Sequence, residues 1–125
     1  MTPTNSRSIL ALLRIEGAAA FAAGLAGYSM LADGWLMLVL FALVPDLAII
    51  GYLSGLRTGT RLYNLAHTYA APALLGAVGV WTLHSLLPLA CIWVAHIGLD
   101  RALGYGPKSG TSFSVTHLGR IGRAA

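Results

Sequence analysis

A histidine and an aspartate stand four positions apart near the end of an apolar run. They are His96 and Asp100, in the segment WVAHIGLDRAL that starts at Trp93. On a helix, residues with this spacing share one face, one turn apart, so the two side chains can act together. Arg101 follows them and is rotated off that face. An imidazole beside a carboxylate can bind a metal ion, or the carboxylate can fix the tautomer of a metal-binding histidine.

Three more ionisable side chains stand inside other apolar runs, namely Glu16, Asp46 and His67. Imidazoles combined with carboxylates suit Zn²⁺, and they suit Mn²⁺ or Fe²⁺ where oxygen ligands dominate. The sequence therefore predicts a site for a divalent metal such as zinc, with these three residues and His96 as ligands. Asp100 is then a further ligand or the group that orients His96. No H-E-x-x-H motif is present, so the helices must bring these residues together.

The composition determines the class of protein. The chain has 125 residues, of which 57% are hydrophobic and only 10% are charged. Soluble domains carry roughly 25% charged residues, so the chain is expected to be an integral membrane protein with the lipid bilayer as its main partner. The net charge is +4, but the basic residues are scattered at the ends of apolar segments. This arrangement is typical of membrane topology and excludes a nucleic-acid-binding surface.

Four apolar segments are long enough to cross a bilayer, for which about 20 residues suffice. We expect one integral membrane domain over residues 1–125, an all-α, four-helix transmembrane bundle. The predicted spans are residues 9–31, 35–54, 61–81 and 83–103, and residues 104–125 form a tail. Prolines at positions 45, 72 and 88 interrupt three of these spans, and Pro45 is expected to kink its helix.

The lysines and arginines predict the orientation of the spans. They precede the first span, lie between the second and third, and follow the fourth: Arg7, Arg57, Arg61, Arg101, Lys108, Arg120 and Arg123. The other two connections carry none. Cytoplasmic loops are enriched in basic residues, so both termini and the middle loop are predicted to be cytoplasmic.

This orientation places the ionisable groups at one depth. At about 1.5 Å per residue, Glu16, Asp46, His67 and His96 all lie ~9–12 Å below the cytoplasmic surface, one in each span. A charged group that faces lipid costs roughly 2.5–3.5 kcal/mol, so the four are expected to point at one another. The site is then a layer inside the bundle that opens to the cytoplasmic side.

Five other residues are candidates for substrate binding or support of this layer: Arg14, Tyr63, Asn64, Arg101 and His117. Tyr63 and Asn64 share a helix face with His67. Arg101 either anchors the helix end at the membrane surface or contacts a substrate. His117 belongs either to a tail that folds back under the layer or to a basic tail attracted to anionic lipid.

Blocks along nearly the whole chain resemble a family of small bacterial integral membrane proteins, domain of unknown function 4260. The blocks are Arg14-Ile-Glu16-Gly17, Pro45-Asp46-Leu47 with Gly51-Tyr52, Tyr63-Asn64-Leu-Ala-His67-Thr-Tyr69 with Pro72, His96-Ile-Gly98-Leu-Asp100-Arg101 with Gly104-Tyr105-Gly106, and Thr116-His117-Leu118-Gly119. The resemblance implies a multi-pass protein of the bacterial inner membrane, and it implies no activity.

Three functional hypotheses follow. In the first, the layer is the site of a metal-dependent hydrolase or a ligand-binding protein, with Glu16, Asp46, His67, His96 and Asp100 in catalytic roles and a lipid-like or small-molecule ligand. In the second, the chain is a small proton-coupled transporter that works as a homo-oligomer. In the third, it is a structural membrane subunit, and arginines neutralise the carboxylates in an internal polar network.

Overall fold

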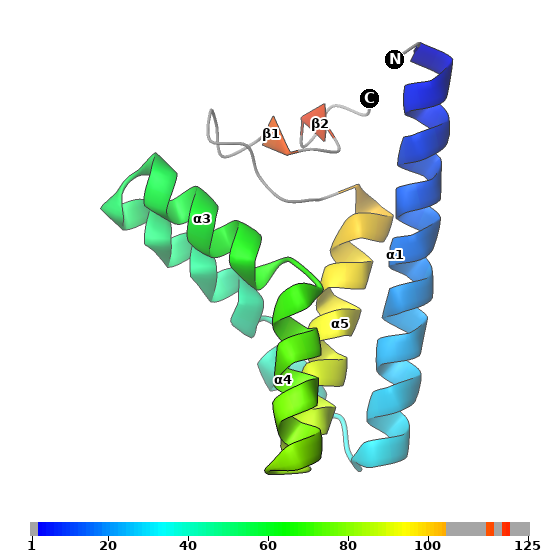
Figure 1. Ribbon diagram of the computed structural model, residues 1–125, viewed down its shortest axis with the longest axis vertical. Coiled ribbons are helices and arrows are strands. Elements are labelled where there is room, and N and C mark those ends of the chain that lie inside the picture. Colours follow the sequence, from blue (N-terminus) through cyan, green and yellow to red (C-terminus); the bar gives the residue numbers. More distant parts are fainter. Residues whose placement is uncertain (1–2, 105–114, 117–118, 121–125) are drawn as a thin grey trace.

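The computed structural model describes residues 3–104, 115–116 and 119–120 (Figure 1). Almost all of this part of the chain is helical. The elements are α1 (Pro3–Leu31), α2 (Leu36–Ala42), the 3₁₀ helix η1 (Val44–Ser54), α3 (Leu56–Ala66), α4 (Ala70–Trp81), α5 (Leu86–Leu103), and the short antiparallel strands β1 (Val115–Thr116) and β2 (Gly119–Arg120). The all-helical expectation for the membrane part is therefore confirmed.

Three segments are long and apolar enough to cross a membrane: Ser6–Leu31, Leu36–Ser54 and Leu86–Leu103. A fourth apolar helix, Ala70–Trp81, is shorter. Many large apolar side chains on these helices are exposed, such as Ile15, Leu53 and Trp81. Helices of this kind satisfy their own backbone hydrogen bonds and can face lipid, which indicates a multi-pass membrane protein.

Helices α1 and α5 form a closely packed antiparallel pair. A Cβ atom added at Gly17 would lie 2.7 Å from the carbonyl oxygen of Gly98, and one added at Gly24 would lie 2.7 Å from the amide nitrogen of Ala95. Small residues let the two backbones approach this closely without a hydrophobic driving force. The start of α1 and the end of α5 consequently lie at the same end of the molecule (Figure 1).

The second and third predicted spans are each divided into two helices, so the helices number more than the four predicted. The second divides at Leu43 into α2 and η1. Pro45 has no amide hydrogen to continue the α-helical ladder. The amide of Asp46 donates to the Leu43 carbonyl at 3.0 Å, three residues back, as in a 3₁₀ helix.

The third span divides after Ala66, and α4 begins at Ala70. Pro72 lies in the first turn of α4, where its missing amide hydrogen leaves no bond unmade. Continuing α3 through this point would require Pro72 to donate to the carbonyl of Thr68, which it cannot do. The proline thus sets the beginning of a new helix.

Helices η1 and α3 form a hairpin that leans away from the α1–α5 pair (Figure 1). Gly55 makes the turn with a φ of 118°, which favours glycine. The hairpin is closely packed, because a Cβ atom at Gly59 would meet the ring of Tyr52. It branches from the bundle at the level where both spans are divided.

Candidate metal centre

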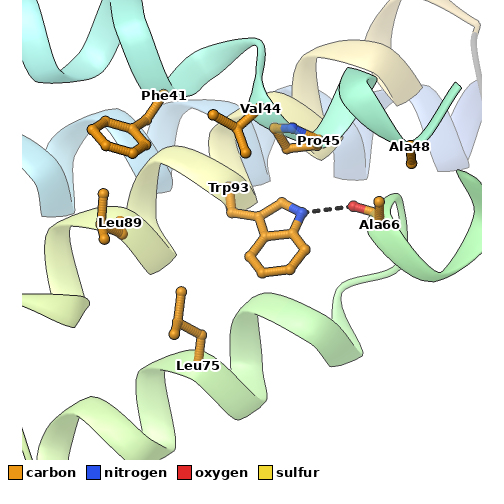
Figure 2. A pocket seen from close by; sticks show the side chains of 8 residues that line it. All are labelled: Phe41, Val44, Pro45, Ala48, Ala66, Leu75, Leu89 and Trp93. Carbon is orange, nitrogen blue, oxygen red and sulfur yellow. Dashed lines mark hydrogen bonds between the residues drawn. The ribbon is translucent and has the colours of Figure 1, made fainter. Parts of the chain in front are cut away.

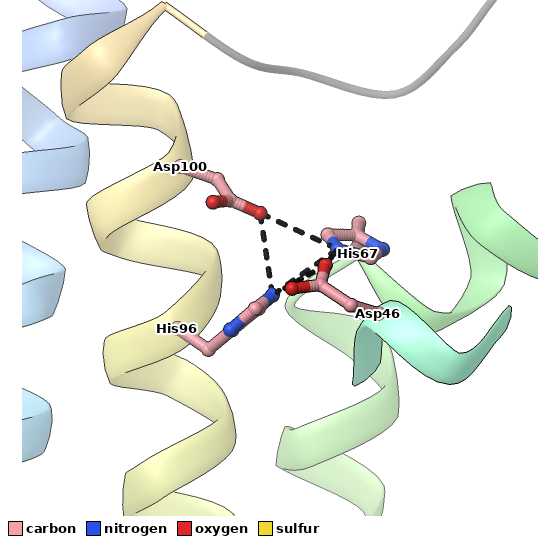
Figure 3. A group of neighbouring side chains, drawn as sticks. All are labelled: Asp46, His67, His96 and Asp100. Carbon is pink, nitrogen blue, oxygen red and sulfur yellow. Dashed lines mark hydrogen bonds and ion pairs between the residues drawn. The ribbon is translucent and has the colours of Figure 1, made fainter. Parts of the chain in front are cut away.

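Four ionisable side chains meet where the hairpin leaves the bundle (Figure 3). Asp46 lies in the first turn of η1, and His67 caps the end of α3. His96 and Asp100 lie one turn apart on α5. We call these four residues the His/Asp cluster. The two divided spans thus contribute one ligand each, directly at the points where their helices are interrupted, and the continuous α5 contributes two.

The four side chains each direct one atom toward a common centre. The Nε2 atom of His67 lies 3.2 Å from Oδ1 of Asp46 and 3.3 Å from Oδ2 of Asp100. The Nε2 atom of His96 lies at the same two distances from the same two oxygens. The two Nε2 atoms are 3.2 Å apart. All four atoms lie within 4.8 Å of one another, which is the spacing of a metal-ligand set.

Five of the six distances among the four atoms are 3.2–3.3 Å, and the sixth, between the two carboxylate oxygens, is at most 4.8 Å. Zn²⁺ binds imidazole nitrogen and carboxylate oxygen at about 2.0–2.2 Å, so the ligand atoms of a tetrahedral zinc site are roughly 3.3–3.6 Å apart. Five of the six spacings are therefore close to those of a tetrahedral zinc site. Two imidazoles and two carboxylates are also a donor set that zinc accepts.

The tautomer of His67 is set by the backbone of its own helix. Its Nδ1–H group donates to the carbonyl oxygen of Tyr63 at 2.8 Å. A carbonyl can only accept, so Nε2 of the neutral ring carries a lone pair, and this lone pair faces the two carboxylates. Metal-binding histidines are commonly oriented in this way, with the second ring nitrogen donating to a carbonyl or a carboxylate.

Packing also holds the ring of His67 in place. The ring of Tyr63 stacks on it with centroids 3.9 Å apart and an angle of 11° between the planes. The side chain of His67 is 3% exposed, and that of His96 is 8% exposed. Tyr63 therefore packs against a residue of the cluster. Asn64 supports it through its backbone carbonyl, which accepts the amide hydrogen of His67 at 3.2 Å.

The two carboxylates differ in exposure. The side chain of Asp46 is 41% exposed and that of Asp100 is 23% exposed. Among the described residues, the ion pairs of both carboxylates are made with the two histidines. One divalent cation among two carboxylates and two neutral imidazoles gives a group with no net charge, which a membrane interior tolerates far better than a charged one.

Glu16 is not brought into the cluster. Its neighbour Gly17 packs against Gly98 and Arg101, so Glu16 lies close to the level of Asp100. However, Glu16 is exposed and is not one of the four clustered residues. The expected layer with one ionisable group from every span is therefore wrong for the first span.

The two arginines predicted near the site contact other groups. Arg14 donates from Nε to the carbonyl of Ala102 at 2.9 Å, at the end of α5. Arg101 lies over the ring of Tyr69, with its guanidinium carbon 4.4 Å from the ring centroid. Both therefore join helices beside the cluster, and among the described residues Asp46 and Asp100 are paired with histidines and not, as expected, with Arg14 or Arg101. His117 lies outside the described residues.

Trp93 is a supporting residue that the sequence did not reveal. Its indole Nε1–H donates to the carbonyl of Ala66 at 2.6 Å. Ala66 directly precedes His67, so this bond ties the interrupted end of α3 to α5. The available signal was the spacing of three residues between Trp93 and His96, which places both on one side of α5.

An apolar cavity of about 400 Å³ lies next to the cluster (Figure 2). It is bounded by α2, η1, α5 and the two halves of the third span and is open on one side. Its lining residues are Phe41, Val44, Pro45, Ala48, Ala66, Leu75, Leu89 and Trp93. Three of them are close in sequence to a cluster residue, since Pro45 and Ala66 directly precede Asp46 and His67, and Trp93 is one turn before His96.

Comparison with known proteins gives one match. The family model described as "Domain of unknown function (DUF4260)" matches residues 10–121, so the resemblance seen in the sequence is confirmed. No curated protein and no solved structure matches the chain.

Proposed function

The chain belongs to the family described as domain of unknown function 4260, and we propose that it is a membrane-embedded metalloprotein that binds one divalent transition-metal ion, preferentially Zn²⁺. The ligands are Asp46, His67, His96 and Asp100. The observation that supports this function best is the set of distances of 3.2–3.3 Å that separate their facing atoms.

The two nitrogen and two oxygen donors favour Zn²⁺ over Mg²⁺ and Ca²⁺. Mg²⁺ and Ca²⁺ prefer six or more oxygen ligands, whereas this site offers two nitrogens. Four ligands match the coordination number of Zn²⁺ in its commonest geometry, and five of the six spacings between their facing atoms fit a tetrahedron. The charge of the ion also balances the two carboxylates, so the buried site is neutral.

The ion has a clear role in the architecture. It links η1, the end of α3 and α5 at the level where two spans lose continuous backbone hydrogen bonding. A network of protonated histidines and carboxylates is the alternative, and it is the form that the structural-subunit hypothesis takes here. The metal site and the metal-free network are distinguished by whether the purified protein carries a metal ion.

A metal-dependent hydrolase is the second candidate, and the exposure of Asp46 favours it. Zinc hydrolases use three protein ligands and keep the fourth position for water. Asp46 is the most exposed of the four ligands, and it lies at the start of the hairpin. Its displacement leaves His67, His96 and Asp100 as a three-ligand set with a free position for water.

The remaining parts of the proposal concern the cell. We place both termini on the cytoplasmic side, so that the site opens toward the cytoplasm, in the inner membrane of a bacterium. The distribution of arginines and lysines supports the orientation, and the helices that are long enough to span a bilayer support the location.

Metal analysis of the full-length protein tests the proposal. Protein purified in detergent with Zn²⁺ and then desalted is expected to retain about one zinc per chain, measured by plasma mass spectrometry. The double variant His67→Ala/His96→Ala is expected to retain none. His84→Ala is the matched control, because His84 is exposed and outside the cluster. Wild-type protein without zinc, or a double variant with full zinc content, contradicts the proposal.

A further inference from the structure

The apolar cavity beside the His/Asp cluster has the features of a chain-binding site. We propose that it holds the hydrocarbon chain of a single-chain amphiphile whose anionic oxygen headgroup, a carboxylate or a phosphate, reaches the metal ion. The inference rests on the proposed metal function and adds the class of ligand to it. It joins two observations, the composition of the cavity and its position.

The composition of the cavity excludes polar ligands. All eight lining side chains are apolar except for the indole nitrogen of Trp93. That nitrogen already donates to the carbonyl of Ala66. A sugar, nucleotide or peptide in the cavity would leave its polar groups without partners, at a cost of several kcal/mol each. A hydrocarbon chain has no such groups, and the volume of about 400 Å³ falls within the usual range for small-molecule sites.

The cavity is accessible from the side of the bundle. Phe41 and Val44 line it, and they are also 42% and 45% exposed on the surface. Both lie in the apolar segment Leu36–Ser54, which is long enough to cross a membrane. A chain can therefore enter laterally from the surrounding lipid without crossing water.

The position of the cavity explains the choice of headgroup. Two lining residues are chain neighbours of the cluster, since Pro45 directly precedes Asp46 and Ala66 directly precedes His67. The proposal therefore places the head of the bound chain at this side of the cavity, within reach of the ion. Asp46 is the most exposed ligand there, and an incoming carboxylate or phosphate oxygen supplies the same kind of donor as the oxygen it displaces.

Fluorescence quenching by brominated amphiphiles tests the proposal. The variant Trp35→Phe/Trp81→Phe leaves Trp93, inside the cavity, as the only tryptophan. Dibromostearate and a dibromostearoyl lysophosphatidate are the anionic probes, and dibromostearyl alcohol is the uncharged one. Zinc-loaded protein in detergent is expected to show saturable quenching by at least one anionic probe. The alcohol is expected to bind about tenfold more weakly, because its head carries no charge for the ion. The anionic probe that binds more tightly identifies the headgroup.

Two sets of variants serve as controls. Trp35→Phe/Trp93→Phe leaves the exposed Trp81, which reports only partition of the probe into the micelle. Ala48→Phe and Leu75→Phe each fill the cavity, and each is expected to abolish saturable quenching while zinc content stays at the level of the parent. Zinc retention shows that a variant is folded, so either variant alone can decide the outcome.

The results separate this proposal from the metal function. Protein that binds zinc but shows no more quenching at Trp93 than at Trp81 overturns the amphiphile site and leaves the metal site standing. Equal binding of the alcohol and the anionic probes overturns the contact between headgroup and metal. Protein that binds no zinc overturns both proposals.

Discussion

The Nε2 atoms of His67 and His96 lie 3.2 Å apart, although 29 positions separate the residues in the sequence and they belong to different helices. Two imidazole nitrogens face each other at this distance when they share a proton or bind one cation, and the proposed metal site requires the second. We expect Co²⁺ bound in place of zinc to show the strong visible absorption of a tetrahedral complex. His84→Ala is expected to keep this spectrum. Weak absorption typical of six ligands would contradict the tetrahedral geometry.

Bound zinc is expected to stabilise the protein against heat, because the ion holds three elements together only in the folded state. At a zinc concentration 100 times the Kd, the gain is about 2.7 kcal/mol. It appears as a higher unfolding temperature in nanodiscs, followed by circular dichroism with and without a chelator. The double variant His67→Ala/His96→Ala is expected to unfold at the same temperature in both conditions. A zinc effect of full size in that variant would place the stabilising ion elsewhere.

Replacement of Tyr63 tests how the ring of His67 is held. Tyr63→Ala removes the ring stacked on the imidazole at 3.9 Å and is expected to lower zinc affinity by about tenfold, as for other residues that orient a metal ligand. Tyr63→Phe keeps the stacked ring, and its zinc affinity should stay within a few-fold of wild type. The measurement is competition with a chromophoric chelator. Equal losses in both variants would mean that the hydroxyl, and not the stacked ring, matters.

The glycines between α1 and α5 give a stability test. A Cβ atom at Gly17 would lie 2.7 Å from the Arg101 Cβ atom and 2.8 Å from the amide nitrogen of Ala102. Gly17→Ala is therefore expected to force the helices apart and cost about 1–3 kcal/mol of unfolding free energy. At Gly76 the nearest atom is 3.7 Å away, so Gly76→Ala is the tolerated control. Unfolding in mixed micelles measures both, and equal stabilities would contradict the close packing.

Loss of the Trp93 hydrogen bond is expected to weaken zinc binding. Trp93→Phe keeps an aromatic ring in the cavity but leaves the Ala66 carbonyl without its 2.6 Å donor. We expect a loss of about 0.5–1.5 kcal/mol in stability and weaker zinc binding, since Ala66 precedes His67. Trp81→Phe, at an exposed position, is the matched control. A variant with unchanged stability and affinity would show that the bond does not position His67.

The level of Glu16 relative to His96 along their helices could be predicted from the sequence, but the rotation of Glu16 about its helix axis could not. Counting residues placed Glu16 and His96 near one level, and the contacts of Gly17 agree with that level. Only His96 turns toward the cluster, because the side of α1 that faces α5 is set by its glycines. Gly17 and Gly24 of α1 face α5, and Gly98 of α5 faces α1. With Gly17 turned toward α5, its neighbour Glu16 points away from the cluster.

The positions of the prolines were informative, but their effect was underestimated. Pro45 was expected to kink the second span and Pro72 to interrupt the third. Instead, each span divides into two helices, and the hairpin of η1 and α3 turns away from the bundle. Whether a proline bends a helix or ends it depends on what the freed backbone and side chains contact afterwards. Here Asp46 and His67, at the two helix breaks, contact His96 and Asp100 on α5. The sequence around each proline does not show that these contacts form.

The cluster residues lie on η1, at the end of α3 and on α5, so they are synthesised in that order. Asp46 and His67 leave the ribosome first, and the cluster stays half complete until His96 and Asp100 have entered the bilayer with α5. Asp46 and His67 can pair with each other before that, at the 3.2 Å seen in the structure, but their two partners on α5 are still missing. In the proposed metalloprotein, the complete ligand set therefore exists only after the last helix is in place.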